Sequence, residues 1–238
     1  MLDQEAQRAL RERYYPNLEE VIFAPVHAAL SDPRLAGGAV LDAGCGKGTW
    51  VLRGHKDQLG LLVGVDVQDA GNDLADAVAL GALENLPFRA ESFDLILCYV
   101  VLEHVARPER AFAEFARVLK PGGTLVFKTP AAYAPVSLLT RLLPYRAHYA
   151  LKSLIGIRSD DVFPTYFRCN TERALRRALA ANGLAVRQLL RVDQTYAYAS
   201  LNKATYILGL LYSRAVQHRG LGWLRNGIIG ICRKEGRP

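Results

Sequence analysis

The run AVLDAGCGKG at residues 39–48 decides the fold of this chain. Its apolar start predicts the end of a buried strand, its glycines predict a tight turn, and the following residues 49–52 predict the start of a helix. Glycine suits such a turn because a Cβ would hold the backbone away from a ligand, while a helix start presents unpaired N–H groups. We therefore expect a ligand to lie against this turn.

A second short apolar run, LLVGVD at residues 61–66, predicts a parallel strand that is covered on both faces. It ends on Asp66, 24 residues after Asp42. In a doubly wound sheet the carboxylate that ends this strand faces the glycine turn, where it can accept hydrogen bonds from both hydroxyls of a ribose. An isolated Asp at a strand end is more often an ordinary loop residue, so the ribose role depends on the neighbouring turn.

The rest of the chain alternates between helical and strand patterns. Before the glycine turn, Pro16 splits an amphipathic leader into two short helices. After it we expect a strand entered through Phe93 and Asp94, and a helix that starts at residues 100–104 and continues over 109–119. Further elements are expected as a strand over 124–127, a helix over 174–181 with Asn170 as its N-cap, and strands over 184–190 and 227–233.

Four motifs in this order resemble those of the class I S-adenosylmethionine-dependent methyltransferases, in their small-molecule branch. They are VLDAGCGKG, GVDV, LPF followed by SFDLILCYVVLEHV, and RVLKPGGTLVF, and they cover about residues 39–129. A nicotinamide-dependent oxidoreductase would instead carry G-x-G-x-x-G, whereas this turn is G-x-G-x-G. The resemblance implies a Rossmann-like, doubly wound α/β sheet of seven strands with the last strand antiparallel. Placing that fold on the chain leaves two extra segments, one after strand five and one between strands six and seven, which we expect to form helical lid insertions.

The resemblance also implies S-adenosyl-L-methionine as the cofactor, held by Asp42, Ala43, Gly44, Cys45, Gly46, Asp66, Val67, Ala82, Leu83 and Tyr99. One position departs from the family pattern. Many relatives have an Asp where this chain has Ala82, and that Asp accepts a hydrogen bond from the adenine amine. Its loss removes roughly 0.5–1.5 kcal/mol of binding unless Glu84, a backbone carbonyl or water takes its place.

The expected organisation has four parts. Residues 1–38 form a helical leader, residues 39–130 the cofactor-binding core, residues 131–169 a lid insertion, and residues 170–238 the remaining core with a second lid insertion at about 194–226. Because both insertions leave the sheet at its C-terminal edge, where ligands bind in open α/β sheets, we expect them to cover the methyl-transfer site.

The charge of the chain is unevenly distributed. Residues 1–130 hold 13 Lys and Arg against 18 Asp and Glu, whereas residues 131–238 hold 17 against 5. In the expected lid, basic residues alternate with apolar runs such as residues 138–143 and 206–212. This pattern favours a small lipophilic or anionic acceptor, or contact with an anionic membrane surface, over a nucleic acid partner. Ordinary buried helices with solvated basic faces would give the same pattern.

Methylation of a hydroxyl benefits from a general base, while methylation of an amine or a stabilised carbanion does not require one. The candidate bases are His104, just after strand four, and His148 in the expected lid, followed by Tyr133, Asp160, Asp161 and Tyr166. A histidine bonded to nearby backbone would explain His104 equally well, and a solvated surface residue would explain His148.

Several classes of protein are disfavoured by what the sequence lacks. The four cysteines are far apart and no histidines cluster, so neither disulfides nor a metal site is expected. The first residues resemble no signal peptide, and no apolar run reaches the roughly 20 residues of a spanning helix. We expect a cytoplasmic methyltransferase, peripheral to the inner face of the membrane if the basic lid contacts it. The alternative is a cofactor-binding partner protein of the same fold that has lost catalysis.

Overall fold

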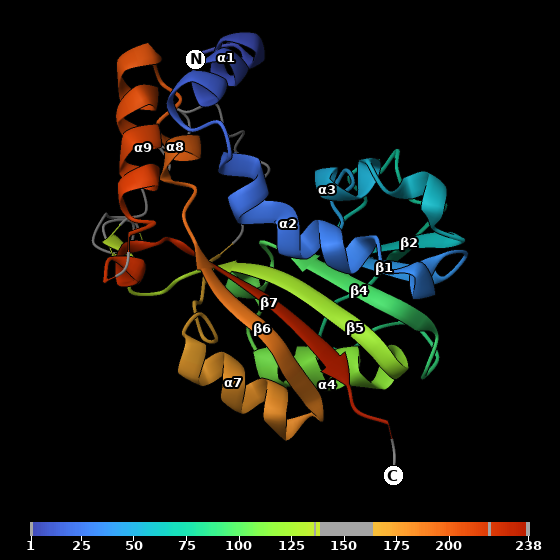
Figure 1. The fold of residues 1–238 in the computed structure, drawn as a ribbon. Helices are drawn as coiled ribbons and strands as arrows, with labels where there is room; N and C mark the ends of the chain where they lie inside the picture. The colour runs from blue at the N-terminus through green and yellow to red at the C-terminus, as the bar shows by residue number, and fades with distance from the viewer. Residues whose placement is uncertain (1, 136, 139–163, 219, 237–238) are drawn as a thin grey trace. The chain divides into compact units, whose positions relative to one another are not determined.

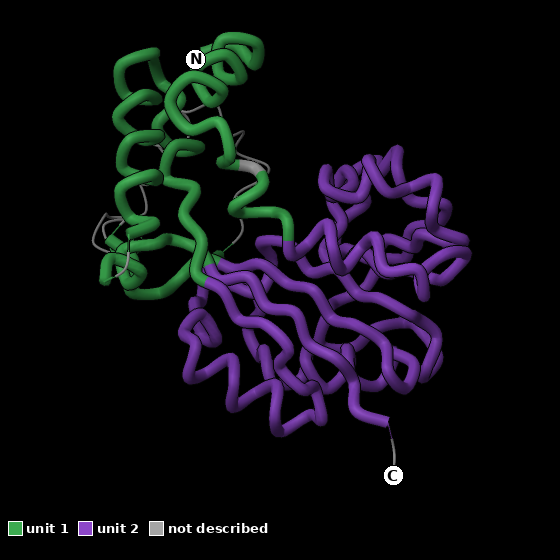
Figure 2. Tube along the Cα trace, viewed as in Figure 1, with its two compact units in different colours: residues 1–24, 130–164, 191–227 green, residues 25–129, 165–190, 228–238 purple. Residues whose placement is uncertain are grey.

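The computed structural model describes residues 2–135, 137–138, 164–218 and 220–236. Contacts divide the chain into two compact units, coloured separately in Figure 2. Unit 1 contains residues 1–24, 130–164 and 191–227, and unit 2 contains residues 25–129, 165–190 and 228–238. Each unit is thus assembled from three separate stretches of the chain.

Unit 2 is built on a seven-stranded sheet with the order β3-β2-β1-β4-β5-β7-β6. The strands β1 to β5 pair in parallel, and β7 runs in the opposite direction to its neighbours (Figure 1). This is the doubly wound sheet with an antiparallel last strand that the sequence predicted. The strands are β1 (Ala39–Ala43), β2 (Leu61–Asp66), β3 (Ala77–Leu80), β4 (Phe93–Tyr99), β5 (Leu119–Pro130), β6 (Leu184–Val192) and β7 (Gly227–Lys234).

The centre of the sheet is its most deeply buried part. Four of the five residues of β1 are buried, as are five of the seven residues of β4. The chain continues from β1 to β2 on one side, while β4 pairs with the other side of β1. The order of the strands therefore reverses between β1 and β4, and in open α/β sheets this is where ligands bind, outside the carboxyl ends of the strands.

The helices of unit 2 begin and end largely as the sequence patterns predict. They are α3 (Trp50–Arg53), α4 (Pro108–Val118) and α7 (Glu172–Ala181), and α4 packs against α7 (Figure 1). The prediction of Asn170 as N-cap of α7 is wrong: Thr171 caps this helix by accepting a hydrogen bond from the backbone N–H of Ala174. Asn170 instead donates from its side chain to Thr129, because a buried polar partner is available there.

The structure differs from the local predictions at three other places. The helix expected from residue 100 is a single 3-10 turn, Leu102–His104, and α4 starts separately at Pro108. Strand β3 was not predicted at all, because its four residues Ala-Val-Ala-Leu form too short a run to stand out. Strand β5 also extends well beyond the predicted residues 124–127 at both ends.

Unit 1 is helical in its described part, which contains α1 (Gln4–Tyr14), the first half of α2 (Leu18–Leu30), α8 (Thr195–Tyr198) and α9 (Lys203–Ala215). Two separate leader helices were predicted, and Pro16 lies between α1 and α2. Helix α9 packs against both α1 and α8. Gly209 permits the close approach to α8, because a Cβ at this position would lie 2.8 Å from the Cα of Tyr196. None of the described helices is long and apolar enough to cross a membrane.

Candidate active site

The glycine turn follows β1 directly, and its backbone conformation requires glycine. Gly44, Gly46 and Gly48 all have positive φ angles, of 77°, 45° and 101°. A Cβ on Gly44 would lie 2.4 Å from a methyl carbon of Val101, whereas a Cβ on Gly46 would meet nothing within 4 Å. The turn is therefore packed on its inner side at Gly44 and open at Gly46, which is the form of backbone that can receive a ligand.

Asp42 is a buried connector between β1 and the helix start, and it does not face solvent. Its side chain is 1% exposed and accepts hydrogen bonds from the backbone N–H and the hydroxyl of Thr49, at 3.0 and 2.7 Å. Burial raises the pKa of the Asp42 carboxyl to about 6, although the two bonds from Thr49 lower it. Asp42 therefore stabilises the conformation of the turn through its two hydrogen bonds with Thr49, the residue after Gly48.

Asp66, at the end of β2, does reach the glycine turn as the sequence predicted. One carboxylate oxygen accepts a hydrogen bond from the backbone N–H of Gly46 at 2.9 Å, and the other accepts one from the N–H of Gln68 at 3.1 Å. Each carboxylate oxygen has a second acceptor position. The half-buried carboxylate can thus bind the turn and still accept hydrogen bonds from a ligand's hydroxyls.

Three further predicted cofactor residues lie in the loops that follow β2 and β3. Val67 is 59% exposed, and Leu83 is buried. Ala82 is exposed, and its backbone carbonyl accepts a hydrogen bond from Asn85. The carboxylate of the nearby Glu84 accepts a hydrogen bond from the backbone N–H of Arg107 at 3.3 Å and has further acceptor positions.

On the other side of β1, Tyr99 ends β4 within an aromatic and cationic cluster. Its ring meets Trp50 edge-on at 6.3 Å between centroids, and the Lys128 ammonium lies 4.8 Å from the centroid of the same ring and donates to the Tyr99 hydroxyl at 3.2 Å. The next residue, Val100, has a φ of +61°. A β-branched residue in this conformation is strained, and such strain is concentrated at functional sites.

His104 lies one turn further along, at the end of the 3-10 segment. Its ring nitrogen Nε2 is 3.9 Å from a carboxylate oxygen of the buried Glu103. Glu103 also accepts a hydrogen bond from Thr129 at 3.3 Å, and its backbone carbonyl accepts from Tyr166 at 2.7 Å. His104 is thus partly exposed beside a buried carboxylate, close to the carboxyl ends of β4 and β5.

The other candidate bases are distributed differently. Tyr166 belongs to unit 2 and is 46% exposed, whereas Tyr133 belongs to unit 1 and is 64% exposed. His148, Asp160 and Asp161 lie outside the described residues, as does most of the first lid insertion. Among the described candidates, His104 is the histidine that the fold brings to the carboxyl edge of β4.

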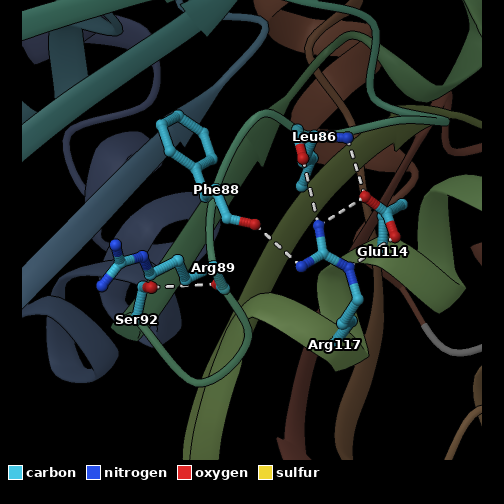
Figure 3. A network of polar contacts seen from close by, with 6 residues as sticks. All are labelled: Leu86, Phe88, Arg89, Ser92, Glu114 and Arg117. Carbon is cyan, nitrogen blue, oxygen red and sulfur yellow. Dashed lines mark hydrogen bonds and ion pairs between the residues drawn. The ribbon is translucent and has the colours of Figure 1, made fainter.

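A network that the sequence did not reveal anchors the segment after β3 (Figure 3). The Arg117 guanidinium donates to the backbone carbonyls of Leu86 and Phe88 at 3.0 and 2.8 Å, and it binds the Glu114 carboxylate through two bonds of 2.7 Å. Glu114 in turn accepts from the N–H of Leu86. Arg117 lowers the pKa of Glu114 through these bonds. The sequence shows only that Arg117 follows Glu114 by three residues on α4. The backbone partners of Arg117 cannot be predicted from that spacing.

Some basic residues of the second half have structural roles. The Arg225 guanidinium donates to three backbone carbonyls, those of Val216, Arg191 and Gln217, and Arg214 donates to the carbonyl of Tyr14.

All four cysteines are free and buried, and burial raises the pKa of each thiol. Within the described part of the chain, no group of three His, Cys, Asp or Glu side chains is placed to hold a metal ion.

Comparison with known proteins finds similarity to methyltransferases. The family model described as "Methyltransferase domain" matches residues 41–127, which run from within β1 to within β5. Among curated relatives, a tRNA (carboxymethyluridine(34)-5-O)-methyltransferase of Arabidopsis thaliana is 34% identical over 141 residues, covering 56% of this chain and 35% of its own length. A ubiquinone biosynthesis O-methyltransferase of Hahella chejuensis is 35% identical over 144 residues, covering 55% of this chain and 58% of its own length.

The matched part of the chain thus spans 35% of the length of the first relative and 58% of the length of the second. Among solved structures, the geranyl diphosphate C-methyltransferase of Streptomyces coelicolor A3(2) superimposes with a TM-score of 0.58, 17% identity and coverage of 98% of this chain and 85% of its own. At this identity the likeness concerns the fold. Residues 41–127 thus match a methyltransferase domain, and the sheet with its antiparallel last strand has the Rossmann-like fold of the S-adenosylmethionine-dependent methyltransferases.

Proposed function

We propose that this protein binds S-adenosylmethionine at the glycine turn and transfers its methyl group to a small acceptor. The observation that carries the proposal is the hydrogen bond between Asp66 and the N–H of Gly46, which joins the end of β2 to the turn after β1, the strand that borders the reversal point of the sheet. The residues present suit the cofactor, because the turn is open at Gly46 and the Asp66 carboxylate retains acceptor capacity.

In this proposal each predicted residue has a defined task. Asp66 accepts hydrogen bonds from the ribose hydroxyls, the exposed Val67 and the buried Leu83 cover the adenine, and the backbone of residues 43–46 contacts the remainder of the cofactor. Asp42 acts indirectly by holding Thr49 and therefore the turn. The sulfonium centre of the cofactor supplies the activated methyl group, so the protein's main task is to orient the acceptor and exclude water.

We propose a hydroxyl oxygen as the atom that is methylated, and a lipophilic or anionic molecule as the acceptor. Both curated relatives described above are named as O-methyltransferases, which supports oxygen as the acceptor atom. His104 is the proposed general base, because it is partly exposed and lies beside the buried Glu103 carboxylate, which would stabilise a protonated imidazole. His148 remains a second candidate from the sequence.

The cofactor assignment is tested by calorimetry with S-adenosylmethionine and the Asp66→Ala variant. We expect the variant to bind at least tenfold more weakly, because it loses both the ribose acceptor and the bond that holds the Gly46 N–H. Asp69→Ala is the matched control, since Asp69 is an exposed carboxylate of the following loop that accepts only from Gly71 in the described structure. Equal affinity of the Asp66 variant and the wild type would contradict the ribose assignment.

The acceptor is best found by incubating the protein with methyl-labelled cofactor and a cell extract, then identifying the labelled product. Label in a small molecule supports the proposal, and label in RNA or protein contradicts the acceptor class. Binding of the cofactor without labelled product would favour the alternative of an inactive partner protein. A His104→Gln variant that keeps its cofactor affinity but loses methyl transfer would support His104 as the base.

We also propose that the described part of the second insertion, residues 194–218 and 220–226, helps to close the methyl-transfer site and gives the protein affinity for anionic membrane surfaces. Support comes from its composition and from α9, which carries the exposed side chains of Leu208 and Leu211 beside Lys203 and Arg214. Apolar residues flanked by cations are typical of helices that bind anionic lipid. Equal sedimentation with neutral and anionic liposomes at low salt would contradict the electrostatic part.

A further inference from the structure

A groove of about 590 Å³ lies on unit 2 along α7, with Glu109 of α4 among its lining residues. This volume falls in the range of pockets that hold small organic ligands. The glycine turn does not contribute to it, and no residue of the proposed cofactor site lines it. The groove therefore requires an explanation of its own.

Three arginines dominate the groove: Arg168 before α7, and Arg173 and Arg177 on its exposed face. None of the three guanidinium groups forms an ion pair with a carboxylate of the described chain. Other arginines of the same protein do so, among them Arg8 with Glu12, Arg53 with Asp73 and Arg117 with Glu114. Glu109 is the one carboxylate that lines the groove, so its formal charge is positive.

Three alanines of α7 also line the groove, and they are called its alanine floor below. Ala174, Ala178 and Ala181 recur every three or four residues on α7, so they share one face of the helix and their small side chains leave the space open. Thr171 lies at the start of the helix, where its oxygen accepts from the Ala174 N–H and its hydroxyl hydrogen can still be donated. The groove thus combines an apolar floor with forked cationic donors and a hydroxyl donor.

We propose that this groove is a binding site for a phosphate ester, with the phosphate group held by the arginines and a small apolar part lying on the alanine floor. Guanidinium groups match phosphate oxygens in pairs, and several of them around one hollow suit a phosphate or diphosphate better than a single carboxylate. The site is separate from the cofactor site, so it does not depend on the proposed methyl transfer. The ligand would be either a soluble phosphate ester or the headgroup of a phospholipid.

The test is calorimetry of the full chain at low salt with inorganic diphosphate as the probe. We expect saturable binding that weakens at least tenfold in the Arg173→Ala/Arg177→Ala double variant. Arg176→Ala is the matched control, because Arg176 is an exposed neighbour on the same helix that does not line the groove. The control should bind within twofold of the wild type, and all variants should keep the wild-type affinity for S-adenosylhomocysteine.

A second arm distinguishes the two sources of phosphate. Flotation with phosphatidylcholine vesicles, with and without phosphatidic acid, tests for a lipid headgroup. The site is assigned to lipid if the acidic vesicles recover the wild type and Arg176→Ala but do not recover the double variant. Diphosphate binding without such recovery assigns it to a soluble ester. Absence of both, or an equal loss in the Arg176→Ala control, overturns the proposal, and unchanged S-adenosylhomocysteine binding in the same samples would leave the cofactor site intact.

Discussion

At the scale of single residues, the burial of Asp42 makes the stability of the folded protein depend on pH. The pKa of its carboxyl is about 6 in the folded protein, above the value of about 3.9 for an unfolded aspartate. The folded protein therefore binds more protons than the unfolded chain between these pH values, and the contribution of Asp42 to stability decreases as pH rises from about 4 to 6. Above pH 6 this contribution is constant and unfavourable, by about 3 kcal/mol relative to acid pH.

Replacing Asp42 by Asn should remove this dependence. An Asn side chain can still accept from the Thr49 N–H and can donate to the Thr49 hydroxyl, so both bonds are retained. We expect the free energy of unfolding, measured in urea from pH 4 to pH 7, to fall less steeply in the variant than in the wild type. Asp69→Asn, at an exposed site, should reproduce the wild-type slope, and an Asp42→Asn slope equal to the wild type would contradict the raised pKa.

Ala82 provides a gain-of-function prediction at the same scale. Ala82 is exposed, and the nearby Glu84 carboxylate already accepts a hydrogen bond from the Arg107 backbone, so an acid at position 82 would add an acceptor for the adenine amine. Ala82→Asp should tighten S-adenosylmethionine binding by about 2- to 10-fold in calorimetry, the worth of one hydrogen bond. Ala90→Asp adds the same charge at another exposed position and should have no effect. Weaker binding in Ala82→Asp would show that adenine is bound elsewhere.

At the scale of elements, α4 positions the segment that contains Ala82 and Leu83. Arg117 of this helix donates hydrogen bonds to the backbone carbonyls of Leu86 and Phe88 and so holds the segment against α4 (Figure 3). In Arg117→Met these carbonyls and the Glu114 carboxylate lose their partner, at a cost of about 1–3 kcal/mol. We expect a lower unfolding midpoint and faster amide exchange over residues 81–92. In the control Arg89→Met both should stay at wild-type values, because the Arg89 side chain is exposed and makes no contact with Arg117 in Figure 3.

At the scale of the whole molecule, the lid proposal predicts that cofactor binding slows amide exchange in both compact units. Binding of S-adenosylmethionine should slow amide exchange in unit 2 at residues 42–49 and 64–68, because the ligand removes water from these backbone groups. If residues 194–218 help to close the site, their exchange should slow as well. Protection confined to unit 2 would contradict the lid, while absence of protection at the glycine turn would contradict cofactor binding itself.

The sequence by itself determined the parts of the molecule that local patterns encode. The apolar runs before Asp42 and Asp66, the glycines between them and the proline between α1 and α2 each specify backbone geometry within a few residues, so these elements were predictable. The order of four motifs then predicted the fold class and the resemblance to class I methyltransferases. The resemblance also identified Asp66 as a site residue, and the structure brings its carboxylate to the turn.

Only the tertiary structure decided which distant groups meet. Asn170 was a good local N-cap, but the buried hydroxyl of Thr129, 41 residues away, is its partner. Arg117 and the Leu86 carbonyl, 31 residues apart, follow the same rule, as does the contact of Arg11 with Tyr206 across 195 residues. Side-chain polar groups can choose among many partners, and burial selects among them because an unsatisfied buried group is costly. Local periodicity contains no information about that choice, which is made when the elements pack.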